Sequence, residues 1–77
     1  MVKAYILITA AIGKVKSVAK ELNGIRDVKA VHVVTGPYDI IAFVDTKDMD
    51  TLSKAVVSGI HKIKGVVDTN TAIVIGI

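Results

Sequence analysis

Residues 33–44, VVTGPYDIIAFV, determine how the rest of the chain is arranged. Two apolar runs rich in β-branched residues flank a short break that holds the chain's single proline. Such runs are typical of paired strands, and a short connection that contains glycine joins them as a hairpin. Gly36 can adopt a positive φ, and Pro37 fixes the φ of the first central turn position. We therefore expect Tyr38 and Asp39 at the tip of a hairpin, where binding groups are often carried on a rigid sheet.

Apolar runs on either side of this hairpin indicate a sheet of four strands. Residues 5–10 predict the first strand and residues 71–77 the last, while the two hairpin strands cover residues 28–35 and 39–45. Valine and isoleucine dominate an apolar content of 52%, which favours a sheet-rich core.

Apolar residues at helical spacing predict two amphipathic helices. The first carries Val15, Val18, Ala19 and Leu22. It is expected to end at Asn23–Gly24, because both residues tolerate the left-handed conformation. The second begins near Asp48, whose carboxylate can cap the first turn, and ends at Lys64–Gly65. Its expected buried stripe is Met49, Leu52, Val56, Ile60 and Ile63, and close packing against the sheet would explain Gly59 within it.

The two halves of the chain resemble each other. Residues 24–27 (GIRD) and residues 65–68 (GVVD) each follow a predicted helix and lead into an apolar strand. Two similar βαβ halves joined by a hairpin give the ferredoxin-like βαββαβ plait, an α+β fold. Right-handed crossovers then place both helices on one face of a four-stranded antiparallel sheet. Residues 1–77 are expected to form this single domain.

The predicted strands are apolar on both faces, although two helices can cover only one. Ile6 and Ile8 lie opposite Leu7, and Ile40 and Ala42 lie opposite Ile41 and Phe43. An exposed apolar sheet face of this size is typical of an interface. We therefore expect the second face to pack against another copy of the chain across a two-fold axis, giving a dimeric α/β barrel.

Size and composition narrow the class of protein. A 77-residue chain buries only about 60% of its unfolded surface, so oligomerisation would supply a missing support. The chain has no cysteine, so that support is neither a disulfide nor a thiolate metal site. No stretch resembles a signal peptide, and the apolar runs are far shorter than the roughly 20 residues of a membrane span. We expect a soluble cytoplasmic protein.

Charged and titratable residues give little support for catalysis or nucleic-acid binding. The net charge is only +3, and the lysines near residues 14–20 are expected on a solvated helix face. His32 is expected as a packed core or interface residue and His61 on the surface. The carboxylates of Asp45, Asp48 and Asp50 are explained by caps and turns. With no phosphate loop, metal-ligand cluster or nucleophile elbow, we predict no enzyme activity, no metal and no cofactor.

A second polar feature precedes the predicted last strand, at residues 68–71, DTNT. If the chain is already extended there, Thr69 and Thr71 point to the same side and offer two hydroxyls. Asp39 offers an acceptor suited to an ammonium group, and the amides of the Gly36 turn suit a carboxylate. Together these groups would hold a zwitterion. The alternative is that threonine is merely favoured in strands and aspartate in turns.

These elements together resemble one known family. Residues 35–39 (TGPYD), followed by a strand, a helix, Gly65–Val66 and then Thr69-x-Thr71, are similar to the regulation of amino-acid metabolism (RAM) domain of Lrp/AsnC transcription regulators. The resemblance covers essentially the whole chain. It implies sheet-to-sheet dimers that assemble into rings, commonly octamers. It also implies an amino-acid effector bound between dimers by Gly36, Tyr38, Asp39, Thr69 and Thr71, with Pro37 at a variable position.

The sequence also differs from the family regulators in one respect. Those regulators carry an N-terminal helix-turn-helix domain, which residues 1–77 do not contain. A stand-alone RAM protein that does not bind DNA itself and co-assembles with full-length regulators is therefore expected. The alternative function is a small oxygenase or isomerase of the dimeric α/β-barrel class. It would need polar groups in a cavity between sheet and helices, and His32 is the candidate there. A third option is a purely structural scaffold.

Overall fold

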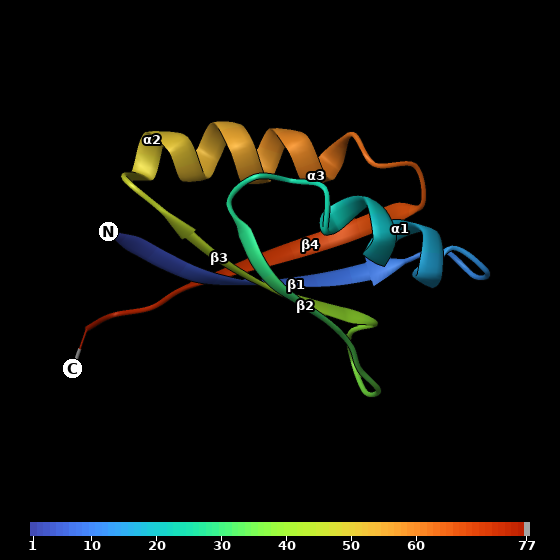
Figure 1. Ribbon diagram of the computed structural model, residues 1–77. Helices are drawn as coiled ribbons and strands as arrows, with labels where there is room; N and C mark the ends of the chain where they lie inside the picture. The colour runs from blue at the N-terminus through green and yellow to red at the C-terminus, as the bar shows by residue number, and fades with distance from the viewer. Residues whose placement is uncertain (77) are drawn as a thin grey trace.

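The chain forms four strands and two helical stretches in the order βαββαβ, as the sequence predicts (Figure 1). The computed structural model describes residues 1–76, without the side chains of residues 55 and 56. The first half consists of β1 (Val2–Ala10), α1 (Val15–Leu22) and β2 (Val28–Val33). The second half consists of β3 (Ile40–Thr46), one helical stretch, and β4 (Val66–Ile73). That stretch has three segments, α2 (Met49–Thr51), η1 (Leu52–Ser58) and α3 (Gly59–His61).

The four strands form one antiparallel sheet in the order β2-β3-β1-β4. Figure 1 shows α1 and the second helical stretch on the same face of this sheet. The predicted ferredoxin-like α+β fold and the placement of its helices are therefore confirmed. We call the side away from the helices the open face.

Strict alternation along the two central strands places the core under the helices. β1 and β3 contribute every second residue, because successive strand side chains point to opposite faces. The helices add Val18, Leu22, Leu52 and Ile60. The strand members of this buried cluster are Ala4, Ile6, Ile8, Ile40, Ala42 and Val44. The predicted stripe of α1 is confirmed, with Val15 and Ala19 packed against the cluster.

The second helical stretch matches its prediction in part. Asp48 caps it as predicted, since its Oδ1 accepts a hydrogen bond from the Thr51 amide at 2.7 Å. Leu52 and Ile60 are buried and Ile63 packs against the core, but Met49 is 49% exposed, so its predicted burial is wrong. Met49 is the first residue of α2, in the first turn of the stretch. The predicted Val56 side chain lies outside the described residues.

The first helix ends by a different mechanism from the one expected, and the second ends earlier than expected, although Gly65 has a positive φ of +106°. α1 ends before Asn23 as predicted, but Asn23 keeps φ at −63°, and no positive φ occurs at Gly24. Asn23 instead donates from its backbone amide and from Nδ2 to the Ala19 carbonyl, both at 3.2 Å. The second stretch ends at His61, three residues before the predicted Lys64. Gly59 does not approach the sheet closely, because a Cβ there would meet only Ile25, at 3.9 Å.

The observed strand boundaries differ from the predicted ones, most of all in β4. This strand begins at Val66, five residues before the predicted start, because backbone pairing with β1 already extends through the polar run at residues 68–71. The ladder hydrogen bonds come from the main chain, so small polar side chains do not interrupt it. β1 begins at Val2, β2 ends at Val33, and β3 spans Ile40–Thr46. Ile77, part of the predicted last strand, lies outside the described residues.

The open face of the sheet is apolar at its centre, as predicted. The rings of Tyr5 and Phe43 lie with their centroids 5.0 Å apart, and Tyr5 remains 46% exposed. Leu7 pairs with Ile41 beside them, and both side chains are half-buried. No helix covers this face (Figure 1) in the part of the chain that the structure describes.

Candidate functional site

The loop between β2 and β3 is longer than the sequence suggests, which moves two of the expected site residues. The Val34 amide donates to the Asp39 carbonyl at 2.9 Å and closes the loop. Gly36 has a φ of +110°, which confirms its expected positive φ. The exposed tip is formed by residues 35–37, whereas Tyr38 and Asp39 are half-buried at the base of the loop. Their predicted position at the tip is therefore wrong.

Asp39 is held against the end of β1 by two hydrogen bonds. Its amide donates to the Ile8 carbonyl at 3.0 Å, and its Oδ2 accepts from the Ala10 amide at 2.9 Å. These bonds fix the carboxylate to the end of β1, which is one of the two central strands of the sheet. The second carboxylate oxygen can still accept a hydrogen bond from a ligand, because an ionised carboxylate has two acceptor oxygens.

Tyr38 lies on the open face and contacts β4 rather than its own hairpin. The Tyr38 hydroxyl accepts a hydrogen bond from Nδ2 of Asn70 at 3.1 Å. Asn70 pairs with Leu7 in the sheet, so its side chain shares the open face with that residue. This contact ties the hairpin to a strand 32 residues further along the chain.

The two threonines point to the same side, as predicted, but this is the helix-covered side. Thr69 lies opposite Ile8 and Thr71 opposite Ile6, and both isoleucines are buried under the helices. The Thr69 hydroxyl lies 2.7 Å from Nε2 of His61 at the end of α3. Within one chain, therefore, the sheet separates Thr69 and Thr71 from Tyr38 on the opposite face.

Sequence reasoning missed two residues that contact the expected site. Asn70 lies inside the polar run at residues 68–71, but a side-chain partner 32 residues away gives no local signal. The sequence predicts only a surface position for His61, and this residue is indeed exposed. Its bond to Thr69 arises where α3 turns back into β4, which residue spacing alone does not reveal.

The position of His32 tests the alternative that the chain is a small oxygenase or isomerase. This residue pairs with Ile41, whose side chain belongs to the open face, and it is exposed there. The alternative requires a histidine in a cavity between sheet and helices. His32 therefore lies on the wrong side of the sheet for that role in this chain, in a position suited to an interface.

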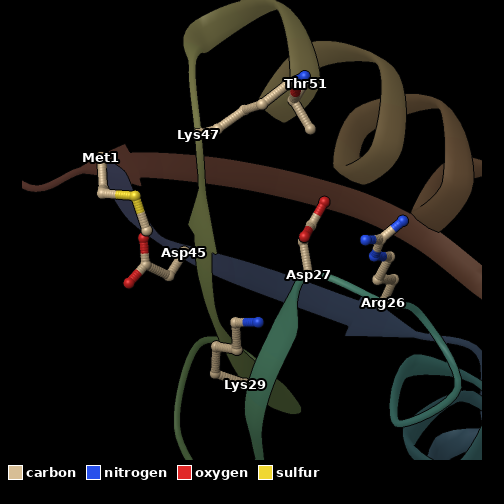
Figure 2. Close-up of a pocket in the computed structure, with 7 residues that line it drawn as sticks. All are labelled: Met1, Arg26, Asp27, Lys29, Asp45, Lys47 and Thr51. Carbon is tan, nitrogen blue, oxygen red and sulfur yellow. The ribbon is translucent and has the colours of Figure 1, made fainter.

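Two of the hollows on the described surface contain none of the expected effector residues. The larger, about 520 Å³, lies at the end of the sheet where β2 begins and β3 ends (Figure 2). It is lined by Met1, Arg26, Asp27, Lys29, Asp45, Lys47 and Thr51. The smaller, about 170 Å³, lies beside the Thr69 contact and is lined by His61, Val66, Val67 and Asp68.

The position of Asp45, which lines the larger hollow, differs from the one that the sequence predicts. The sequence assigns its carboxylate to a cap or turn, but Asp45 belongs to β3, and its Oδ1 is buried with no hydrogen-bond partner among the described residues. Figure 2 shows Asp45 projecting from β3 and Lys47 from the segment that follows this strand, in different directions. A buried acceptor without a donor costs about 1–3 kcal/mol.

Other functional groups are sparse in the described part of the chain. No three His, Cys, Asp or Glu side chains gather there as a metal site would require. Hydrogen bonding from Thr51 holds the pKa of Asp48 below its ordinary value, which is the signature of a helix cap. Among the described helices, none is both long and apolar enough to cross a bilayer.

Comparison with known proteins assigns the chain to a family. Residues 3–77 match the family described as the Lrp/AsnC ligand binding domain. The chain belongs to this family. It is a regulatory ligand-binding domain, and the resemblance inferred from the hairpin and the threonine pair is confirmed.

Relatives of this Lrp/AsnC domain include longer proteins. An uncharacterized HTH-type transcriptional regulator, PH0140 from Pyrococcus horikoshii, is 36% identical over 70 residues, which cover 91% of this chain and 44% of the relative. The chain thus spans less than half the length of that protein. The crystal structure of TTHA0845 from Thermus thermophilus is 32% identical, with a TM-score of 0.94, and the match covers 100% of this chain and 96% of that one.

Structures of regulators share the same fold. Escherichia coli AsnC matches 97% of this Lrp/AsnC domain and 51% of its own chain, with 25% identity and a TM-score of 0.91. The transcriptional regulator NMB0573 from Neisseria meningitidis, solved in complex with L-Met, is 19% identical with a TM-score of 0.86, covering 97% of this chain and 50% of that one. At that identity the likeness shows the fold alone.

Proposed function

We propose that this Lrp/AsnC domain is a non-catalytic, oligomeric module that binds an amino-acid effector. The observation that carries this proposal is the Asp39 carboxylate, held at the end of β1 by the Ala10 amide within a family of ligand-binding domains. An ionised carboxylate anchored in this way suits the ammonium group of a free amino acid. The L-Met complex of NMB0573 supports this choice of ligand class.

The effector site is proposed to lie between subunits. Asp39 and the Gly36 loop belong to one end of the sheet, while Thr69 and Thr71 point under the helices from edge strand β4. Because one chain does not bring the two groups together, the hairpin of a neighbouring subunit would complete the site. A ligand that bridges two subunits favours their assembly by as much as its differential affinity for the assembled state.

We further propose that the dimer forms by packing the open faces of two copies. The centre of this face carries Tyr5, Leu7, Ile41 and Phe43. A two-fold axis would bury these side chains and bring polar groups of the second copy toward the unpaired Asp45 oxygen. Dimers built in this way would then join through the hairpins into a ring, such as an octamer.

The regulatory role is proposed to act through partners in the cytoplasm. Residues 3–77 are accounted for by the effector domain, so this segment itself is not expected to contact DNA. Full-length regulators with the same domain would present a similar hairpin and sheet face. Co-assembly with such a regulator would tune its DNA binding in response to the effector.

The test is a thermal-shift screen of the protein with each of the twenty standard amino acids, with native mass spectrometry of the same samples. We expect one or a few amino acids to raise Tm and to shift the population toward the larger assembly. Asp39→Asn should lose the response, whereas Asp50→Asn, on the exposed first turn of the second helical stretch, should keep it. An assembly that responds to no amino acid would contradict the proposal and favour a purely structural scaffold.

A further inference from the structure

The contact between His61 and Thr69 links a titratable ring to an expected effector residue. His61 Nε2 and Thr69 Oγ1 lie 2.7 Å apart, which is the distance of a well-formed hydrogen bond. The ring comes from α3 and the hydroxyl from β4, so the contact closes the turn between these elements. His61 is exposed, so solvent protons reach it.

The direction of this hydrogen bond depends on the charge of the ring. In an imidazolium both nitrogens are donors, so Thr69 Oγ1 must accept from His61. The hydroxyl hydrogen is then directed elsewhere, and a ligand carboxylate can accept it. In a neutral ring Nε2 can itself be the acceptor, and Thr69 then donates its hydrogen to His61. Protonation of His61 therefore fixes Thr69 as the acceptor from the ring and leaves its hydroxyl hydrogen for a ligand, whereas in the neutral ring the direction depends on the tautomer.

We propose that His61 is a positioning residue that sets Thr69 as a donor to the effector's carboxylate and thereby makes effector binding stronger at acidic pH. The inference rests on the proposed function, in which Asp39 takes the ammonium end of the ligand. The carboxylate end, which the sequence assigns to the amides of the Gly36 turn, would also accept a hydrogen bond from the Thr69 hydroxyl of the adjoining subunit. The positive imidazolium behind the hydroxyl adds a favourable field for that carboxylate.

The charged residues near His61 are one aspartate and three lysines. Asp68 of β4 lines the same small hollow, and Lys62 and Lys64 follow in its own segment. Lys14, at the start of α1, lies against Gly65, just beyond this segment. Histidine is the side-chain type whose charge ordinarily changes between pH 5 and 8, so a change of affinity across that range would point to the ring rather than to these neighbours.

The experiment is isothermal titration of the full chain with L-methionine and each of the other standard amino acids at pH about 5.5 and about 8. We expect affinity to be about three- to tenfold higher at the lower pH, the range of one hydrogen bond. His61→Gln can still bond to Thr69 but does not titrate, so it should bind with little pH dependence. Thr69→Val should bind more weakly and also lose the pH dependence, whereas Lys62→Gln should behave as wild type.

The outcomes separate the two proposals. Binding by the wild type with equal affinity at both pH values, or pH dependence that survives in His61→Gln, would overturn the role of His61 and leave the proposed function intact. Failure of every amino acid to bind would overturn both. Long-range nitrogen NMR of the His61 ring adds a readout that needs no ligand: Thr69→Val should alter the Nε2 signal, and an unchanged signal would show that the hydrogen bond is not formed in solution.

Discussion

Tyr38 and Asn70, which are 32 residues apart, meet on the open face through a hydrogen bond of 3.1 Å from Asn70 Nδ2 to the Tyr38 hydroxyl. This bond joins the β2–β3 loop to edge strand β4, and it is the only side-chain hydrogen bond between them among the described residues. The loop carries Asp39, the proposed ammonium-binding residue. It is thus held by β4, which lies on the opposite side of β1 from β3.

Removing this hydrogen bond should loosen the effector loop. Tyr38→Phe keeps the ring and deletes the hydroxyl, so we expect a loss of about 0.5–1.5 kcal/mol in the free energy of unfolding and weaker effector binding. Urea denaturation and isothermal titration measure the two effects. Asn70→Ala should cost less stability in the Tyr38→Phe background than in the wild type, because its partner is already gone. Strictly additive costs in this double-mutant cycle would show that the two residues do not interact.

Replacing Asp39 should distinguish the role of its hydrogen bond to the Ala10 amide from the role of its negative charge. Asp39→Asn keeps an oxygen that can accept from the Ala10 amide, so Tm should change little, while effector affinity should fall at least about tenfold because a charged partner is lost. Asp39→Ala removes both and should abolish binding. Calorimetry of the variants, with Asp50→Asn as a control, makes the comparison. Full affinity in Asp39→Asn would show that its charge has no part in binding.

Placing a charge on the open face should dissociate the proposed dimer. Phe43→Asp puts a carboxylate in the aromatic contact with Tyr5, where an unpaired buried charge would be costly. Sedimentation velocity at micromolar concentration should then show a shift toward monomer mass. Ile12→Asp is the matched control, because Ile12 is fully exposed in the turn after β1. A variant at Phe43 that keeps the wild-type mass would place the interface elsewhere.

Two glycines with positive φ should differ in their tolerance of a side chain. Gly65 has a φ of +106°, and a Cβ there would lie 2.8 Å from Lys14 Cβ and 3.0 Å from Val18 Cγ2. Gly36 has a φ of +110°, with nothing within 4 Å of its Cβ position. Gly36→Ala should therefore cost about 1–2 kcal/mol of stability for the backbone alone, and Gly65→Ala about 1–3 kcal/mol more for overpacking. Equal losses in urea denaturation would contradict this prediction.

The Asp48 cap predicts a pH-dependent contribution to stability. Its folded-state pKa is lowered by the Thr51 hydrogen bond, so the stabilisation is fully present above the unfolded-state pKa and is lost as pH falls through the folded value. Asp48→Ala should lower Tm by about 4–8 °C at pH 7. The difference from wild type should shrink below about pH 4, where the carboxyl becomes protonated in the unfolded and then the folded chain. A difference that persists at low pH would point to packing instead of capping.

The local spacing of apolar residues is sufficient to predict which segments are helices, which are strands, and in what order they follow. The spacing of Val18 and Leu22 predicts the buried stripe of α1, and the apolar run at residues 40–44 predicts a strand with two apolar faces. The family pattern at the hairpin and the threonine pair can likewise be recognised without coordinates. The polar residues 68–71 obscure the start of β4, because main-chain pairing does not require apolar side chains.

The ferredoxin-like plait thus follows from sequence patterns alone, since the apolar stripes of helices and strands are a local property of the chain. The sequence patterns do not determine on which face of the sheet each site residue lies. Only the three-dimensional structure shows this. The register of β4 against β1 sends Asn70 to the open face beside Tyr38, and Thr69 under the helices beside His61. Side chains alternate along a strand, so a shift of one residue in this register would exchange the two sets, and strand register depends on contacts far apart in the chain.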